Sequence, residues 1–228
     1  MTQTSKYNIG LIIYPNMTQL DITGPHQVFS FMPNSSIYFV WKNQEPVTSD
    51  RGLTILPNTT FNDCPPLDLI CVPGGPGQVA MMEDNEMLTF LKKQSQNAQL
   101  ITSVCTGSLI LAAAGLLDGY RATCHWAFLD HLALFNVEVS NERVVIDRNR
   151  ITGGGVTAGI DFGLVVVSQL LGEEMAKMIQ LLLQYDPQPP FNTGTPENAD
   201  QSLVKQVQIL GKDLIKSSLS VSQKLTNK

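Results

Sequence analysis

Cys105 is the residue whose type and position most directly indicate chemistry. It follows the apolar, β-type stretch LITSV at residues 100–104 and precedes an apolar helical run at residues 108–116. A cysteine on such a strand-to-helix turn is presented at the carboxyl end of a sheet, and the first amides of the helix favour a thiolate. A buried structural cysteine is the alternative, but the small polar pair Thr106 and Gly107 favours an exposed turn. We therefore expect Cys105 to be a nucleophile with a lowered thiol pKa.

Asp21 and a glycine-rich turn are expected to lie beside this cysteine. Asp21 follows a buried strand predicted at residues 7–13 and precedes a helix that is predicted to start at Pro25. Its carboxyl is either a general acid–base group or a capping or solvated carboxylate. The turn PGGPG at residues 73–77 follows a buried strand at residues 67–72, and its glycines allow backbone amides to approach a ligand closely. The turn has neither a GxGxxG nor a P-loop pattern, so we expect no nucleotide site.

The histidines are interpreted as structural residues. His125 follows a strand predicted at residues 120–124, and we expect it to be a hydrogen-bonded residue near the pocket. His26 and His131 are expected on helix surfaces. Cys124 and His125, taken with His131, could suggest a metal site. However, no third or fourth ligand has the spacing that such a site requires. We therefore expect neither a metal ion nor an organic cofactor.

The order of strands and helices predicts an α/β domain. Short buried strands alternate with helical segments, which is typical of a three-layer sandwich with a mostly parallel sheet and helices on both faces. Ligands of such folds bind outside the carboxyl ends of the strands. The loops that carry Asp21, the glycine-rich turn, Cys105 and His125 all follow predicted strands, so we expect them to line one crevice.

The chain is expected to divide into two segments. Residues 1–186 form the α/β domain. Residues 187–228 begin as an irregular arm rich in Pro, Asn and Thr and continue as one amphipathic helix over residues 201–219. Apolar residues such as Leu203 and Val207 recur at helical spacing, so the helix is expected to pack on the domain or on a partner subunit.

Composition and charge exclude several classes of partner. The net charge of the 228 residues is −5, so no basic surface is expected to bind nucleic acid. No apolar run is long enough to cross a membrane. The four cysteines form neither a CxxC pair nor a disulfide framework, and we expect the protein in the reducing cytoplasm.

Five motifs together resemble the ThiJ/PfpI superfamily. They are QLDITGP at residues 19–25, PGG at 73–75, SVCTG at 103–107, RATCHW at 121–126 and TGGGVTAGID at 152–161. The resemblance implies a flavodoxin-like α/β sandwich, usually a homodimer, with the nucleophilic cysteine at Cys105. Many members have His after this cysteine and Glu on the first-strand loop, where this chain has Thr106 and Asp21. The missing His disfavours protease or amidase chemistry, which uses an imidazole to carry protons.

Within the superfamily, the combination of Asp21 with Cys105 and Thr106 is similar to that of members that hydrate isocyanides. The implied reaction joins the Cys105 sulfur to the terminal isocyanide carbon as a thioimidate, which water converts to an N-substituted formamide. Asp21 acts first as acid and then as base. The expected catalytic residues are Cys105, Asp21 and Thr106, and the expected substrate contacts are Gly75, Thr106, His125 and Val156.

Two other functions remain open from the sequence. The first is a ligand-sensing domain without turnover, like those of AraC-type transcription regulators. The short segment after Asp186 is not basic and contains no helix-turn-helix domain, which counts against a regulator. The second is glyoxalase-like or deglycase-like action on reactive carbonyls, which the absence of His beside Cys105 disfavours.

Overall fold

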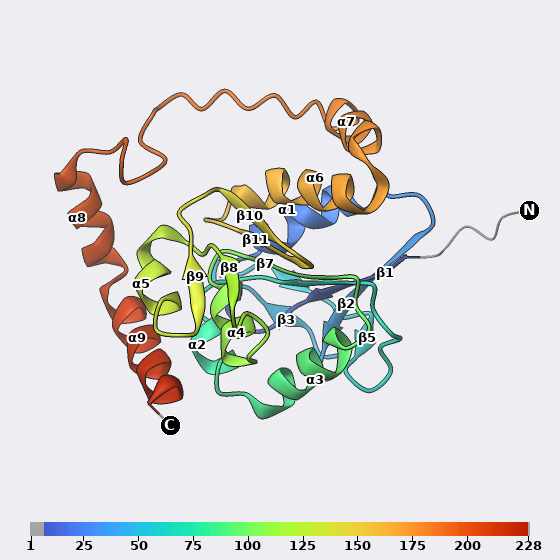
Figure 1. The fold of residues 1–228 in the computed structure, drawn as a ribbon, viewed down its shortest axis with the longest axis horizontal. Coiled ribbons are helices and arrows are strands. Elements are labelled where there is room, and N and C mark those ends of the chain that lie inside the picture. The colour runs from blue at the N-terminus through green and yellow to red at the C-terminus, as the bar shows by residue number, and fades with distance from the viewer. Residues whose placement is uncertain (1–6, 228) are drawn as a thin grey trace, which may run out of the picture.

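A seven-stranded sheet forms the centre of the computed structural model, which describes residues 7–227 (Figure 1). Its strands are β1 (Tyr7–Ile12), β2 (Ser35–Trp41), β5 (Thr59–Thr60), β6 (Leu69–Val72), β7 (Leu100–Val104), β10 (Val144–Asp147) and β11 (Arg150–Gly153). Their order across the sheet is β10-β11-β7-β6-β1-β2-β5. Every neighbouring pair is parallel except β10 and β11. Residues 1–6 and 228, the outer ends of the two expected segments, lie outside the described residues.

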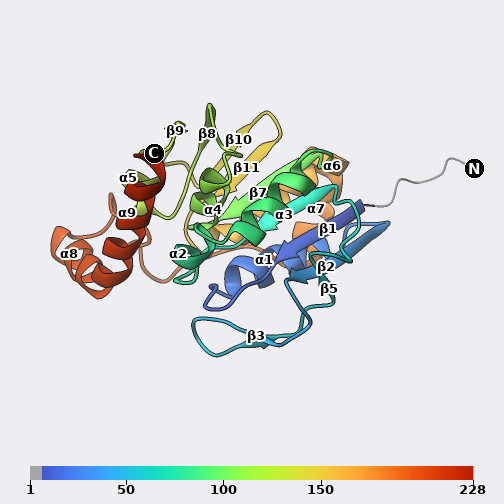
Figure 2. The same ribbon diagram turned by 90° about the horizontal axis from the view of Figure 1, so that it is seen from below.

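Helices cover both faces of this sheet (Figures 1 and 2). One face carries α1 (Leu20–Phe29), α6 (Ala158–Leu171) and α7 (Glu173–Leu182). The other face carries α3 (Asn85–Ser95) and α4 (Gly107–Ala113), with α2 (Gln78–Met81) packed against α4. Because both faces are covered, β6 and β7 are buried along their whole length. The predicted three-layer, flavodoxin-like α/β sandwich is thus confirmed.

Smaller elements lie outside the central sheet. β3 (Val47–Thr48) and β4 (Thr54–Ile55) form an antiparallel pair, and β8 (Tyr120–Ala122) and β9 (Val137–Val139) form a parallel pair. A short 3₁₀ helix, η1 (Trp126–Phe128), and α5 (Leu129–Leu132) follow β8. None of the helices between residues 7 and 227 is long and apolar enough to span a membrane.

Helix α1 begins earlier than the sequence predicts. It starts at Leu20 rather than at Pro25, because the amides of residues 21–23 already donate to the carbonyls of Thr18 and Gln19. Pro25 therefore lies inside the helix, and the Asp21 carboxyl belongs to its first turn.

The single terminal helix expected over residues 201–219 is wrong. Two helices, α8 (Gln201–Leu210) and α9 (Lys212–Thr226), meet at Gly211. Glycine is a poor helix former, which accounts for the break. The irregular arm after α7 passes over the outer side of α6 to reach α8 (Figure 1). Helix α9 lies against α2, α4 and α5.

Candidate active site

Three neighbouring strands bring the expected reactive groups to one edge of the sheet. β6 lies between β1 and β7, and all three are parallel, so their carboxyl ends meet. Asp21 lies in the first turn of α1 after β1, Gly74 and Gly75 follow β6, and Cys105 follows β7. The parallel pairing of distant segments therefore places a carboxyl, two backbone amides and a thiol side by side.

The backbone of Cys105 is strained. Its φ of 57° lies in the left-handed region, which costs a non-glycine residue about 1 to 3 kcal/mol. The Cys105 amide donates to the carbonyls of Gly153 (3.0 Å) and Gly154 (2.8 Å), at the end of β11. These two bonds hold the turn between β7 and α4, so β11 fixes the direction of the thiol.

The thiol of Cys105 is buried, and its lowered pKa is a wrong expectation. Only 5% of the residue is exposed. Burial and the neighbouring Asp21 carboxylate raise the thiol pKa well above its ordinary value, and the Thr106 amide opposes them only in part. The resting sulfur is therefore a thiol that needs an acceptor for its proton before it can attack.

Asp21 can supply that acceptor. Its side chain is fully buried, and Oδ2 accepts a hydrogen bond from the Gly74 amide at 2.8 Å. Oδ1 has no hydrogen-bond partner within residues 7–227. Burial raises the Asp21 pKa from 3.8 to about 7, although the Gly74 bond and the Cys105 thiol each lower it. A carboxyl with this pKa both accepts and releases protons near neutral pH.

Gly75 and Thr106 form a second contact at the same edge. The Gly75 amide donates to Thr106 Oγ1 at 3.0 Å, so this amide is engaged by the protein itself. Because that bond uses the hydroxyl oxygen as acceptor, the hydroxyl proton is available for a molecule in the pocket. Gly75 has a φ of 117°, and a side chain there would overlap the Thr18 backbone. Only glycine fits at this position.

Hydrogen bonds between the loops after β1 and β6 support this arrangement, and sequence reasoning missed them. The buried Tyr14 hydroxyl donates to the Pro73 carbonyl at 2.8 Å. The Thr18 amide donates to the Gly74 carbonyl at 2.9 Å. The two loops that carry Asp21 and Gly74 therefore hold each other in place. The isolated residues gave no signal of this pairing, because it depends on the adjacency of β1 and β6.

A pocket of about 480 Å³ opens above this edge. The expected residues that line it are Gly75, Cys105, Thr106, His125 and Val156. The other lining residues are Thr18, Gln19, Leu20, Asp50, Arg51, Pro76, Ala127, Phe128, Val207, Gly211, Leu214 and Ile215. Asp21 is absent from the lining, because its carboxyl is fully buried. It is close enough to the Cys105 thiol for each group to shift the pKa of the other.

The C-terminal helices are the part of the site that sequence reasoning missed. Val207 of α8 and Leu214 and Ile215 of α9 line the pocket together with Gly211. Their apolar spacing was a signal of packing, but the spacing does not say which surface the helices cover. The surface that the helices cover is determined by contacts between distant parts of the chain.

His125 lines the same pocket as Cys105, although the strand before it, β8, belongs to a small two-stranded sheet. Its Nδ1 accepts from the Ala127 amide at 3.2 Å, and burial lowers its pKa. The ring is therefore neutral at pH 7. The expected surface position of His131 is wrong: only 3% of it is exposed, and its Nδ1 lies 3.0 Å from Ser218 Oγ of α9.

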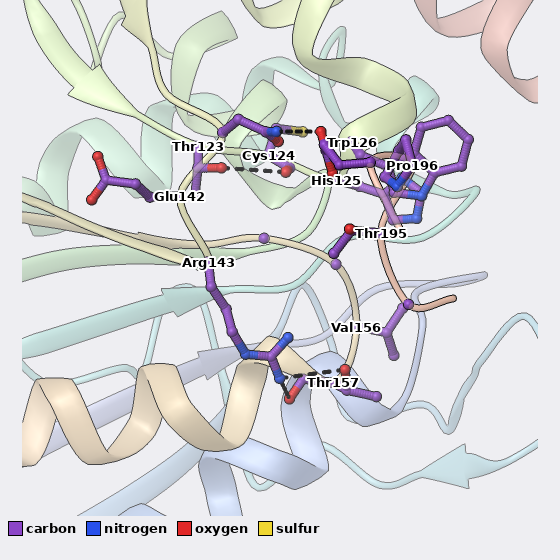
Figure 3. Close-up of a pocket in the computed structure, with 15 residues that line it drawn as sticks. Thr123, Cys124, His125, Trp126, Glu142, Arg143, Val156, Thr157, Thr195 and Pro196 are labelled. Carbon is purple, nitrogen blue, oxygen red and sulfur yellow. Dashed lines mark hydrogen bonds between the residues drawn. The ribbon is translucent and has the colours of Figure 1, made fainter. Parts of the chain in front are cut away.

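A second pocket of about 320 Å³ shares His125 and Val156 with the first (Figure 3). Arg143 stands on one side and donates to the Thr157 carbonyl at 3.1 Å, while Pro196 of the arm stands near His125 on the other. Within the described residues, no group of three or more His, Cys, Asp or Glu side chains is arranged to hold a metal ion.

The sandwich and the strained cysteine at its edge define a class of α/β proteins with a cysteine-centred site. The profile of the DJ-1/PfpI family matches residues 8–169, and the chain belongs to this family. This result confirms the resemblance drawn from the five motifs.

Individual relatives extend the match beyond the family profile. The chain is 49% identical over 198 residues to an isonitrile hydratase of Pseudomonas putida. These residues are 87% of this chain and 87% of that protein. A ThiJ/PfpI family protein from Pseudomonas syringae has a solved structure with a TM-score of 0.93 and 44% identity, covering 96% of this chain and 91% of that chain. The transcriptional regulator GbdR of Pseudomonas aeruginosa is 31% identical over 188 residues, which are 78% of this chain and 51% of the regulator.

Proposed function

We propose that this protein is an enzyme that hydrates isocyanides, R–N≡C, to N-substituted formamides. The observation that carries the proposal is the 49% identity with an isonitrile hydratase, which extends over 87% of both chains. The site supports the same chemistry, because the Cys105 thiol and the Thr106 hydroxyl line one pocket, and the Asp21 carboxyl, with a pKa of about 7, is buried beside the thiol. The proposed reaction uses only protein groups and water.

The first half of the reaction forms a covalent intermediate. The Cys105 sulfur attacks the terminal isocyanide carbon, and the thiol proton passes to Asp21 as the S–C bond forms. The electron pair then left on the carbon takes this proton back from Asp21. The product is a thioimidate, R–N=CH–S, on Cys105. Asp21 suits this exchange because its pKa of about 7 is close to the working pH.

The second half releases the product. Asp21, again a carboxylate, takes a proton from a water molecule whose oxygen attacks the same carbon. One water proton ends on the nitrogen and the other on the sulfur as the C–S bond breaks, which leaves R–NH–CHO and the free thiol. The Thr106 hydroxyl, whose oxygen already accepts from Gly75, directs its proton to the substrate nitrogen.

The test uses the purified full chain with cyclohexyl isocyanide, and mass spectrometry follows the N-cyclohexylformamide. We expect steady formamide production without an added metal or cofactor. Methylglyoxal is offered in parallel, and its consumption without formamide production would favour the reactive-carbonyl alternative. Isocyanide binding by calorimetry with no turnover would favour the sensing alternative.

The assembly proposed with this function is a homodimer. Apolar side chains of α7 and the arm are largely exposed in the single chain: Leu181 by 82%, Met178 and Leu182 by 63%, and Phe191 by 77%. Such a patch is typical of a subunit interface. Sedimentation should give a species near twice the chain mass of 25.0 kDa, and a monomer at all concentrations would refute the dimer. A cytoplasmic location is proposed from the four free cysteines.

A further inference from the structure

The wall of the pocket that faces away from the sheet is made by the last two helices. Val207 of α8 and Leu214 and Ile215 of α9 line the same pocket as Cys105 and Thr106. Cys105 lies at the edge of the sheet, whereas α8 and α9 stand outside the sandwich beyond that edge (Figures 1 and 2). The pocket is therefore bounded by two parts of the chain that are distant in sequence.

The geometry of the substrate decides which part of it meets this wall. An isocyanide is linear from its terminal carbon through nitrogen to the substituent, and only the terminal carbon bonds to sulfur. With that carbon at Cys105, the substituent extends away from the sheet edge into the pocket. We infer that Val207, Leu214 and Ile215 select isocyanides by the size and shape of an apolar N-substituent. This inference rests on the proposed isocyanide hydration.

Charge directs the substituent away from one part of the pocket. The pocket also contains Asp50 and Arg51, whose side chains interact with each other at 3.8 Å. An apolar group placed against these charges would strip them of water without offering a hydrogen bond, which is costly. Contact between this group and the apolar side chains of the C-terminal helices is favourable, because it removes apolar surface from water on both sides.

Substitutions in this wall change the pocket without opening the core. Helix α8 has no buried residue, 43% of Val207 is exposed, and Leu214 and Ile215 are only partly buried. Helix α9 is anchored farther along, where Ser218 contacts His131 at 3.0 Å. A smaller side chain at position 214 therefore enlarges the pocket while α9 keeps its attachment to the domain.

The test compares a small and a bulky substrate in variants of one wall residue. Leu214→Ala should raise the ratio of kcat/KM for 1-adamantyl isocyanide to kcat/KM for methyl isocyanide at least tenfold, and Leu214→Trp should lower it. Leu210→Ala is the matched control, because Leu210 is 87% exposed on the same segment and does not line the pocket. The control should keep the wild-type ratio, and a ratio is insensitive to the fraction of folded enzyme.

Two results separate failure of this inference from failure of the proposed function. Wild-type turnover of both isocyanides, with one unchanged ratio in Leu214→Ala and Leu214→Trp, would overturn the role of the wall and leave the hydration intact. No turnover by the wild type would overturn the proposed function. The wall is then tested by alkylation of Cys105: Leu214→Ala should speed labelling by N-benzyliodoacetamide relative to iodoacetamide at least fivefold, and equal relative rates would refute the wall.

Discussion

The two ends of the Cys105 pocket are built in different ways. The reacting end consists of buried groups fixed by main-chain hydrogen bonds, such as those from Cys105 to the carbonyls of Gly153 and Gly154. The opposite end consists of partly exposed side chains on helices outside the sandwich, such as Leu214. The difference teaches that the proposed chemical step depends on the most constrained part of the fold, whereas the proposed selection of the substituent depends on a peripheral segment that is less tightly packed.

The largest effect is expected at the sulfur. Cys105→Ala should abolish formamide production, because no other group in the pocket provides a soft nucleophile. Cys105→Ser should be nearly inactive as well, since a hydroxyl gives up its proton far less readily than a thiol. Formamide yield by mass spectrometry measures both. Substantial turnover by Cys105→Ala would place the reaction elsewhere and remove the distinction between the two ends.

Asp21→Asn should reduce kcat at least about a hundredfold, because the amide keeps the shape but cannot carry the thiol proton. The wild-type kcat/KM should fall below an inflection near pH 7, where the carboxyl becomes protonated and no longer accepts that proton. The Cys105–Asp21 pair titrates as a unit, so the profile should fall again at high pH, where the raised thiol pKa is reached. Asp118→Asn, at an exposed turn, should keep the wild-type rate and profile.

The same carboxyl makes stability depend on pH with a defined sign. The Asp21 pKa is about 7 in the folded protein against an ordinary value of 3.8, so folding favours the protonated form. The stability that this provides is complete below pH 4 and is lost as pH rises toward 7. Asp21→Asn should therefore be more stable than the wild type at pH 8, by up to about 4 kcal/mol, and similar to it at pH 4. Urea unfolding at both pH values checks this, and an equal difference at both would contradict the buried-carboxyl assignment.

A smaller loss is expected at the neighbouring hydroxyl. Thr106→Val removes the acceptor of the Gly75 amide and the proton aimed at the substrate, while the Thr106 backbone amide remains. We expect a loss of kcat of about tenfold, the size of one hydrogen bond in the reaction. Thr106→Ser should recover most of it. A variant that changes KM alone would assign Thr106 to binding rather than to proton transfer.

The smallest effect is expected at the wall. Val207→Ala should change KM for 1-adamantyl isocyanide by only about two- to fivefold and leave kcat unchanged, because 43% of Val207 is already exposed to water. Thermal unfolding should stay close to that of the wild type. A loss of kcat similar to that of Asp21→Asn would mean that the helices take part in the chemical step.

Local patterns predicted the floor of the site and failed where distant segments meet. A few residues were enough to predict the strand before Cys105 and the turn after it. The same holds for the position of Asp21 near Cys105. The raised pKa of the Cys105 thiol could not be predicted, because it depends on how completely the fold buries the sulfur beside the Asp21 carboxyl. The buried position of His131 could not be predicted either, since Ser218 covers it from a helix at the other end of the chain.

The bonds from Cys105 to the end of β11 also bear on the synthesis of the chain. Asp21 and Gly74 can meet once β1, β6 and their loops have left the ribosome. The Cys105 amide lacks its two acceptors until Gly153 and Gly154 emerge and β11 pairs with β7. A nascent or truncated chain that ends before these glycines lacks both bonds to the Cys105 amide. The reactive centre is therefore completed late in translation, after most of the sheet that shields it already exists.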